Sequence, residues 1–262
     1  MKTPPIVLTI AGFDPSSGAG VTADIKTIAA HGCFGAACIT AVTVQSTRGV
    51  RRVEPLDVRL VRDTLDELAS DLPFEAVRIG MLGSREVANT VADFLGKTRL
   101  AVVVLDSIVR SSSGADLLGA GGIDVLRDRL IPLSTVVTPN IEEAALLGGF
   151  PVWNIAEMRK AGEALLALGA KNVVVTGGHL ADPVDLLVNS EECEEFHGQH
   201  IESRATHGTG CAFATSLTCR LALGDSVEEA VRHANSYVAE AMRAAYPVGH
   251  GAGPLNHLFQ RH

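Results

Sequence analysis

Short apolar, β-branched runs alternate with amphipathic helical segments along almost the whole chain. Each run is apolar at successive positions, so both faces of the strand that it predicts are buried. Strands of this kind, separated by helices, are typical of a mostly parallel sheet covered on both sides. We therefore expect an α/β fold with a mostly parallel central sheet. The predicted strands are residues 6–10, 38–44, 76–79, 100–105, 135–138 and 172–176, with a weaker pattern over 184–188.

The helices between these strands are predicted from their 3.6-residue periodicity. Val21, Ile25 and Ile28 share one face of the helix predicted over 19–30, and Ser226 with Glu229 forms a capping box at the start of 226–245. Two further helices are predicted over 57–69 and 155–168. Residues 182–200 are irregular and acidic, and we expect a β-excursion there. Without repeats or an evident linker, residues 1–262 are expected to form one domain.

Composition narrows the class of protein. The chain has 262 residues, 47% of them apolar, and a net charge of −8, which permits a large core and makes nucleic acid and anionic membranes unexpected partners. Its five cysteines form no CxxC pair, and no apolar stretch approaches transmembrane length. We therefore expect a protein of a reduced, cytoplasmic compartment.

The segment that begins at His207 combines a glycine loop with a helix start. Gly208, Thr209 and Gly210 precede Cys211, and a helical pattern follows. Unpaired backbone N–H groups and the helix dipole make such a terminus a site for an anion, and the same field favours a thiolate. We expect Cys211 to act as a general base beside an anion site. The alternative is a buried cysteine that packs the helix start.

Polar residues follow several predicted strands, at the edge where ligands bind in parallel sheets. They are Asp14, Gln45, Asp106 and Asn140, and the glycine pair Gly177-Gly178 follows a further predicted strand. Asp106 either caps a turn or holds a metal ion that bridges nucleotide phosphates.

Other residues near these strand ends also allow two interpretations. Asn140 and Glu143 have capping-box spacing, with Mg²⁺ binding through water as the alternative. Residues 12–20 match neither a Walker A loop nor a dinucleotide fingerprint, and form either a tight turn or a ligand contact. Gln45 can read one edge of a heterocycle, and Met81 either packs on the ring face or belongs to the core.

Taken in chain order, these motifs resemble the hydroxymethylpyrimidine/phosphomethylpyrimidine kinases of the ribokinase superfamily. The most discriminating element is Gly-Thr-Gly-Cys, with cysteine where sugar-kinase relatives carry aspartate. The motifs that carry the resemblance are residues 11–20, Ala23-Asp24 with Lys26-Thr27, residues 39–41 leading to Gln45, Gly80-Met81-Leu82, Leu105-Asp106, residues 138–144, Gly177-Gly178-His179, residues 207–211 and residues 249–254.

The resemblance implies a three-layer α/β/α ribokinase-like fold, often a homodimer. It implies ATP as phosphoryl donor, Mg²⁺, and 4-amino-5-hydroxymethyl-2-methylpyrimidine and its monophosphate as acceptors on the route to thiamine diphosphate. It also implies a role for each site residue. Gln45 binds the aminopyrimidine, with Gly12, Asp14, Ala19, Met81 and Ile108 around it; Asp106, Asn140, Thr176 and Gly178 bind ATP; Asp106 and Glu143 act on Mg²⁺; Cys211 is the base, and Gly208, Thr209 and Gly210 form the anion hole.

The chain departs from this family in three places. Thr176 stands where a lysine usually reaches the ATP phosphates, and the segment 107–114 differs, although Arg110 offers a substitute cation. In the first loop, Phe13 and Ser17 replace a small residue and a glycine. Thr176 keeps open a weakly catalytic protein that senses the pyrimidine. A pyridoxal kinase also stays open, because a close branch of the superfamily shares the cysteine and acts on a similar flat, hydroxymethylated ring.

Overall fold

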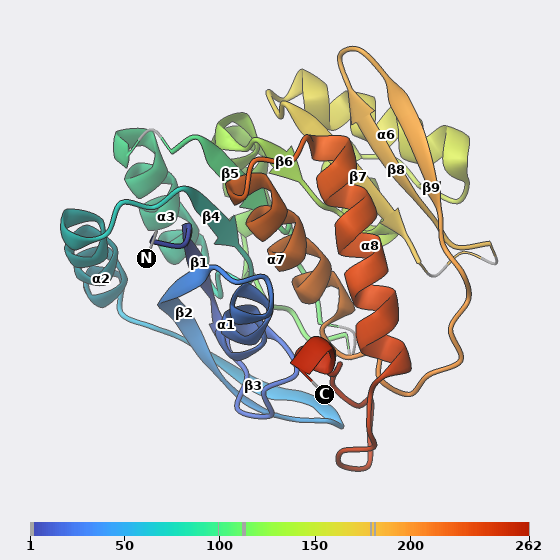
Figure 1. Ribbon diagram of the computed structural model, residues 1–262. Helices are drawn as coiled ribbons and strands as arrows, with labels where there is room; N and C mark the ends of the chain where they lie inside the picture. The colour runs from blue at the N-terminus through green and yellow to red at the C-terminus, as the bar shows by residue number, and fades with distance from the viewer. Residues whose placement is uncertain (1–2, 99, 112–113, 179, 181, 262) are drawn as a thin grey trace.

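A nine-stranded sheet forms the centre of the computed structural model, which describes residues 3–98, 100–111, 114–178, 180 and 182–261. His179 of the glycine motif and part of segment 107–114 lie outside these residues. The strand order is β3-β2-β1-β4-β5-β6-β7-β8-β9 (Figure 1). The six consecutive strands from β2 to β7 are parallel, and the other three are antiparallel to their neighbours.

Each predicted strand is present. The parallel strands are β1 (Ile6–Phe13), β2 (Phe34–Ser46), β4 (Ala76–Ile79), β5 (Val102–Leu105), β6 (Val136–Val137) and β7 (Asn172–Gly177), and β8 is Val184–Asn189. The expected β-excursion contains β8 and β9 (Cys193–His197). Strand β3 (Gly49–Pro55) was not predicted, because it is an exposed edge strand without an apolar run.

Helices cover both faces of the sheet. Helices α1 (Gly20–Ala30), α7 (Thr209–Ala222) and α8 (Val227–Arg243) lie on the face that is turned toward the viewer in Figure 1. Helices α2 (Val58–Asp71), α3 (Arg85–Thr98), α5 (Ile141–Gly148) and α6 (Ile155–Ala167) pack on the other face. The capping box of α8 is confirmed, whereas α3 was not predicted. The short helices are α4 (Gly122–Val125), η1 (Leu126–Leu130), η2 (Ile131–Leu133) and η3 (Phe259–Arg261).

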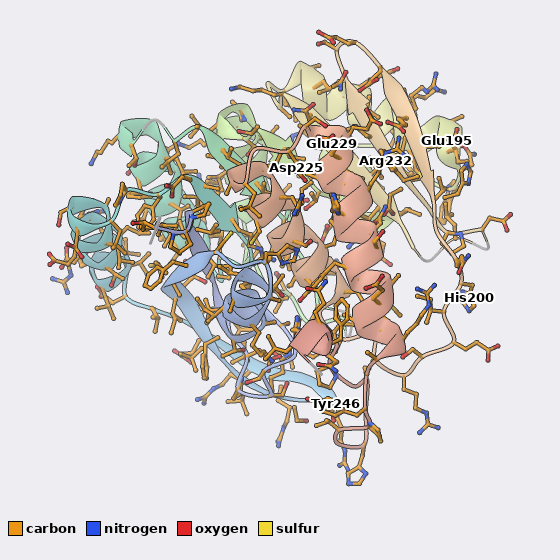
Figure 2. All side chains as sticks on the ribbon, viewed as in Figure 1. Glu195, His200, Asp225, Glu229, Arg232 and Tyr246 are labelled. Carbon is orange, nitrogen blue, oxygen red and sulfur yellow. The ribbon has the colours of Figure 1, made fainter. Side chains whose placement is uncertain are left out.

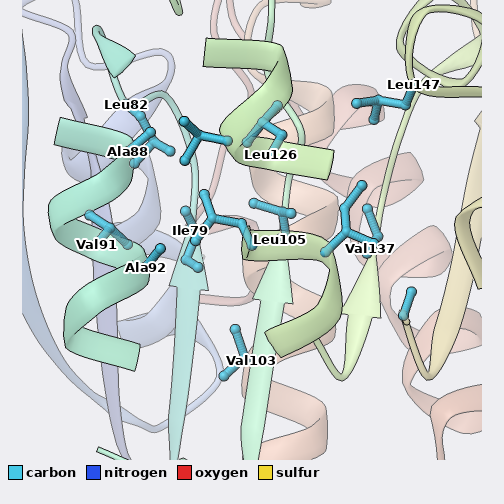
Figure 3. Close-up of a cluster of buried hydrophobic side chains, with 14 of the residues drawn as sticks. Ile79, Leu82, Ala88, Val91, Ala92, Val103, Leu105, Leu126, Val137 and Leu147 are labelled. Carbon is cyan, nitrogen blue, oxygen red and sulfur yellow. The ribbon is translucent and has the colours of Figure 1, made fainter. Parts of the chain in front are cut away.

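The central strands are buried on both faces, as their apolar runs require. Ile79, Leu105 and Val137 of neighbouring strands pack beneath Val91 of α3 and Leu126 (Figure 3). Burial of each such side chain contributes about 1.5–3 kcal/mol to stability. The expected three-layer α/β/α arrangement is therefore confirmed, and this packing holds the carboxyl ends of the strands at one edge.

Helix α8 exposes a charged outer face, on which Figure 2 labels Arg232 and Glu229. Arg232 donates to Glu228 on the same helix at 2.6 Å and to Glu194 of β9 at 2.5 Å. Glu192, Glu194 and Glu228 have carboxylates close enough to share an ion, but Arg232 already neutralises two of them. None of the helices in the described part of the chain has both the length and the apolar character needed to span a bilayer.

Candidate active site

A cavity of about 750 Å³ opens along the edge where the parallel strands end. It extends from Gln45 in β2 to Phe196 in β9, and so crosses most of the sheet. Every candidate residue from the sequence lines it: Gly12, Asp14, Ala19, Gln45, Met81, Asp106, Ile108, Asn140, Glu143, Thr176, Gly178, Gly208, Thr209, Gly210 and Cys211. The structure therefore brings together residues that lie almost 200 positions apart in the chain.

Asp14 organises the loop between β1 and α1. Its Oδ1 accepts hydrogen bonds from Ser16 N (2.8 Å) and Ser16 Oγ (2.7 Å), and its Oδ2 accepts from Gly18 N (3.2 Å) and Ala19 N (3.0 Å). Burial raises the pKa of the Asp14 carboxyl, but hydrogen bonds from His207 and Ser16 outweigh it and hold the pKa below its usual value. Ser17, where the family usually has glycine, has a φ of 61°.

Gln45 was predicted to follow the strand that ends at residue 44. It lies instead within β2, which runs to Ser46. A bulge between Val44 and Gln45 re-aims the side chain, and Gln45 lines the cavity. Gln45 Oε1 lies 3.0 Å from Thr43 Oγ1, and Gln45 Nε2 lies 3.1 Å from His207 Nε2. His207 was seen in the sequence only as part of the glycine motif.

The N-terminus of α7 has the features of an anion site. Gly208 is its N-cap with a φ of 82°, and no side chain caps the helix. A Cβ on Gly208 would lie 1.9 Å from Gly18 O, so only glycine allows the two loops to meet. The residues of the first turn, Thr209, Gly210 and Cys211, line the cavity. Their backbone N–H groups are therefore available to an anion.

The expectation that this helix favours a Cys211 thiolate is wrong for the ligand-free protein. Burial raises the pKa of the Cys211 thiol to about 12. Arg78 lowers the pKa, while the charges of Asp106 and Asp24 raise it further. Desolvation and two carboxylates outweigh Arg78 and a hydrogen bond from the Gly20 backbone, and the thiol is the resting form.

Arg78 is the main site residue that the sequence reasoning missed. It is fully buried in β4, and its Nη1 donates to Asp24 Oδ2 at 3.1 Å while its Nη2 donates to Asp106 Oδ2. Burial disfavours the guanidinium charge, but Asp24 and the other neighbours raise the pKa of Arg78 above its usual value. A Cβ on Gly80 would lie 1.9 Å from Arg78 Nη1, so this glycine makes room for the guanidinium.

Asp24 is held from three elements. Thr9 Oγ1 of β1 and Thr215 Oγ1 of α7 donate to its carboxylate at 2.6 and 2.7 Å, in addition to Arg78. The available signals in the sequence were an arginine inside the apolar run 76–79 and an aspartate on the apolar face of 19–30. A charge at a position that periodicity assigns to the core needs a buried partner.

Two further carboxylates face the same cavity. Burial raises the pKa of Asp106 to about 6 and that of Glu143 to about 8, and the charge of Asp106 adds to the second shift. Glu143 N donates to Asn140 Oδ1 at 2.9 Å and Asn140 N donates to Glu143 Oε2 at 3.0 Å, so the predicted capping box is confirmed. Buried carboxylate oxygens that repel one another suit a hard cation such as Mg²⁺.

The position of the usual lysine offers no cation. Thr176 Oγ1 lies 3.5 Å from Pro139 O, and Thr176 N donates to the same carbonyl at 2.9 Å. Arg110 lines the cavity, as does the neutral Gly178 beyond β7. The far end of the cavity includes apolar residues of β9 and α8 that were not predicted: Phe196, Val238 and Met242.

The chain was compared with families of known proteins. Residues 14–256 match the family described as phosphomethylpyrimidine kinase. A hydroxymethylpyrimidine/phosphomethylpyrimidine kinase of Streptomyces coelicolor is 43% identical over 256 residues, which cover 97% of this chain and 95% of that protein. The thiamine biosynthesis bifunctional protein of Geobacter sulfurreducens is 42% identical over 254 residues; the match covers 96% of this chain but only 52% of that longer protein.

Solved structures share the fold. A pyridoxal kinase of Bacillus subtilis in complex with ADP superposes with a TM-score of 0.92 at 31% identity, covering 99% of both chains. A phosphomethylpyrimidine kinase of Clostridium difficile 630 superposes with a TM-score of 0.81 at 37% identity, covering 90% of this chain and 99% of that chain. Kinases named for two different substrates therefore share this architecture.

Proposed function

The chain is a member of the phosphomethylpyrimidine kinase family, and we propose on this basis that it phosphorylates 4-amino-5-hydroxymethyl-2-methylpyrimidine and then its monophosphate. ATP is the donor, and the diphosphate product serves thiamine diphosphate synthesis. The observation that carries the proposal is the single cavity, which holds a polar ring-reading group, Gln45, together with a helix N-terminus and a thiol at residues 208–211.

Different residues of the cavity are proposed to bind the acceptor, the transferred phosphoryl group and the nucleotide. Gln45 hydrogen-bonds the aminopyrimidine while Met81 and Ile108, which pack in one apolar cluster, border the ring. The N–H groups of the α7 N-terminus stabilise charge on the phosphoryl group during transfer. The apolar side chains of Phe196 and Val238 accommodate the nucleotide base.

Cys211 is proposed as the base that receives the proton of the hydroxymethyl group. Because the thiol is the resting form, this role requires that Cys211 first releases its own proton to solvent and that the loaded site favours the thiolate. Arg78 lowers the pKa of the thiol, and a helix N-terminus favours a thiolate on general grounds. Asp106 and Glu143 are the proposed Mg²⁺ residues, and the ion supplies charge neutralisation to the phosphates when it is bound.

The test is an assay of purified protein with Mg-ATP and the hydroxymethylpyrimidine. We expect the monophosphate to form first and the diphosphate second. A protein that phosphorylates another acceptor but yields neither product contradicts the proposal. Tight pyrimidine binding by calorimetry without product would favour the sensor that Thr176 suggested.

Pyridoxal kinase is the second candidate, favoured by the structural match over the full chain. Pyridoxal also carries a hydroxymethyl group on a flat ring, so both acceptors fit the same general arrangement. Competition of the two acceptors in one reaction separates the candidates, and we expect the pyrimidine to be used in preference. A homodimer in the cytoplasm, acting as one kinase domain over its whole length, is also proposed, and light scattering tests its oligomeric state.

A further inference from the structure

The side-chain amide of Gln45 contacts two polar groups whose roles decide which way it points. One end lies 3.1 Å from His207 Nε2 and the other lies 3.0 Å from Thr43 Oγ1. A half-turn of the amide exchanges its oxygen and nitrogen while leaving both heavy-atom positions in place. The hydrogen-bonding network around it therefore determines where the oxygen lies.

Asp14 settles the role of His207. His207 Nε2 lies 2.8 Å from Asp14 Oδ2, and both oxygens of that carboxylate already accept hydrogen bonds from the loop, at Ser16, Gly18 and Ala19. Asp14 is 3% exposed, and the same contacts keep its pKa low. An ionised carboxylate only accepts hydrogen bonds, so His207 Nε2 has to carry a hydrogen and donate it.

A nitrogen that carries a hydrogen cannot accept one from the Gln45 amide nitrogen. If the Gln45 amide oxygen lies where the nitrogen was placed, the His207 N–H has a second acceptor in addition to Asp14 Oδ2. Gln45 Nε2 then donates to Thr43 Oγ1, and the Thr43 hydroxyl donates to Phe13 O, which lies 3.1 Å away. Each polar group in this series of hydrogen bonds then has a partner. The opposite orientation of the amide places its NH₂ group against the His207 N–H.

We propose that Asp14 and His207 hold the Gln45 amide with its oxygen toward His207 and its nitrogen toward Thr43, and that this clamp determines substrate specificity. The geometry of neighbouring residues supports it. A Cβ on Gly18 would lie 2.2 Å from the His207 ring, so the loop is shaped to receive that ring. The backbone of His207 is also fixed, because His207 N donates to Gly253 O at 3.1 Å.

The clamp leaves one lone pair on Oε1 and one hydrogen on Nε2 for a ligand. His207 directly precedes Gly208, the N-cap of the helix that carries Cys211. The oxygen therefore lies at the end of the amide next to the α7 N-terminus. This step rests on the proposed function: a ring whose hydroxymethyl group faces Cys211 places its adjacent substituent against the oxygen.

That substituent has to be a hydrogen-bond donor, and the next ring atom has to be an acceptor. The 4-amino group and N3 of the pyrimidine meet both requirements. Pyridoxal carries a formyl oxygen beside its hydroxymethyl group, and this acceptor would face another acceptor. The clamp thus selects against pyridoxal even though the ring shapes are similar.

The test compares the 4-aminopyrimidine with its 4-oxo analogue, which has the same size but the reversed pattern of C4=O acceptor and N3–H donor. Binding is measured by calorimetry without nucleotide, so it does not depend on turnover. Since two contacts are reversed, we expect the wild type to bind the amino compound at least about 100-fold more tightly than the oxo compound.

Three variants locate the cause. In His207→Leu the amide is free to turn, and we expect the preference to fall below about tenfold, chiefly because the oxo compound binds better. Thr43→Val removes the acceptor of Nε2 and reduces the preference by less. Thr22→Val is the matched control, because within the described residues the Thr22 hydroxyl bonds to the Asp14 and Ala19 backbone carbonyls and not to the Asp14 carboxylate, His207 or Gln45. Its preference stays at the wild-type value.

Equal binding of both compounds by the wild type overturns the clamp and leaves the kinase proposal standing. A wild type that binds neither compound overturns the proposed function itself. A preference that is unchanged in His207→Leu also overturns the clamp. If that variant does not fold, an unchanged preference in Thr43→Val overturns the clamp in its place.

Discussion

At the scale of single residues, Arg78 determines the charge of the site. Its two arms reach Asp24 and Asp106, which come from a helix and from a strand end. The guanidinium therefore compensates two buried carboxylates beneath Cys211. A lysine carries a single ammonium on a flexible stem and lacks the planar, two-armed geometry that places one Arg78 nitrogen against each carboxylate.

Replacement of Arg78 is expected to destabilise the protein. Arg78→Met leaves Asp24 and Asp106 buried without their cation, and we expect a loss of about 3–5 kcal/mol in the free energy of unfolding. Arg78→Lys keeps the charge and should lose less. Urea denaturation of the three proteins measures the order, and a loss below about 1 kcal/mol for Arg78→Met would show that the pair matters little.

Removal of the Cys211 thiol should affect turnover rather than binding. In Cys211→Ala we expect kcat to fall by about 10²- to 10⁴-fold, because a positioned base is lost, with a much smaller change in the Kd for the pyrimidine. Steady-state kinetics and calorimetry supply the two numbers. A kcat near that of the wild type would mean that another group takes the proton.

At the scale of elements, the C-terminal segment fixes the helices behind the site. His257 is buried, its Nδ1 lies 3.0 Å from Thr27 Oγ1 of α1, and its backbone oxygen accepts from Tyr237 Oη of α8 at 2.9 Å. His257 Nε2 has no partner in the described part of the chain. The segment thus joins α1 to α8 through a neutral imidazole.

This contact predicts a loss of stability in acid. Burial lowers the pKa of His257 to about 3, and the charges of Lys26 and His207 act in the same direction. Because the folded-state pKa lies below the usual value of 6.5, the stabilisation is complete above pH 6.5 and is lost as the pH falls toward 3. The slope from this one group approaches about 1.4 kcal/mol per pH unit.

Denaturant titrations of the wild type and His257→Gln at pH 7 and pH 5 measure the effect. We expect the wild type to lose about 1–2 kcal/mol more than the variant between the two values. Parallel losses would assign the acid sensitivity to other groups.

At the scale of the whole molecule, the sheet brings distant residues to one edge. Gln45 and Cys211 lie 166 positions apart in the chain and line one cavity. A ligand in that cavity contacts both ends of the fold and should stabilise all of it. At a free pyrimidine concentration of 100 times its Kd, the gain is about 2.7 kcal/mol.

Thermal unfolding with and without ligand tests this coupling. We expect the midpoint to rise with the pyrimidine alone and with Mg-ATP alone. The nucleotide effect should shrink when EDTA removes Mg²⁺, since the phosphates then lose the cation that Asp106 and Glu143 are proposed to hold. In Gln45→Ala the pyrimidine effect should be lost while the nucleotide effect remains. If neither ligand raises the unfolding midpoint, the assignment of the cavity as the binding site is contradicted.

Local sequence patterns were sufficient to predict the three-layer fold of this protein and the edge of the sheet at which its candidate site lies. Apolar runs and helical periodicity report the burial of each segment. Because parallel strands all end at one edge, the sequence alone places Asp14, Asp106 and Asn140 there. The exposed strand β3 was not predicted, because an edge strand needs no apolar run.

The partners of the buried charges could be assigned only from the folded chain. Arg78 pairs with residues 54 positions before it and 28 after it, and His207 meets Asp14 across 193 positions. Spacing along the chain reports neighbours within a few residues, whereas desolvation and Coulomb energy depend on distances in space. For this reason the sequence located the Cys211 thiol but misjudged its charge, and the orientation of Gln45 followed only from the packing of two distant loops.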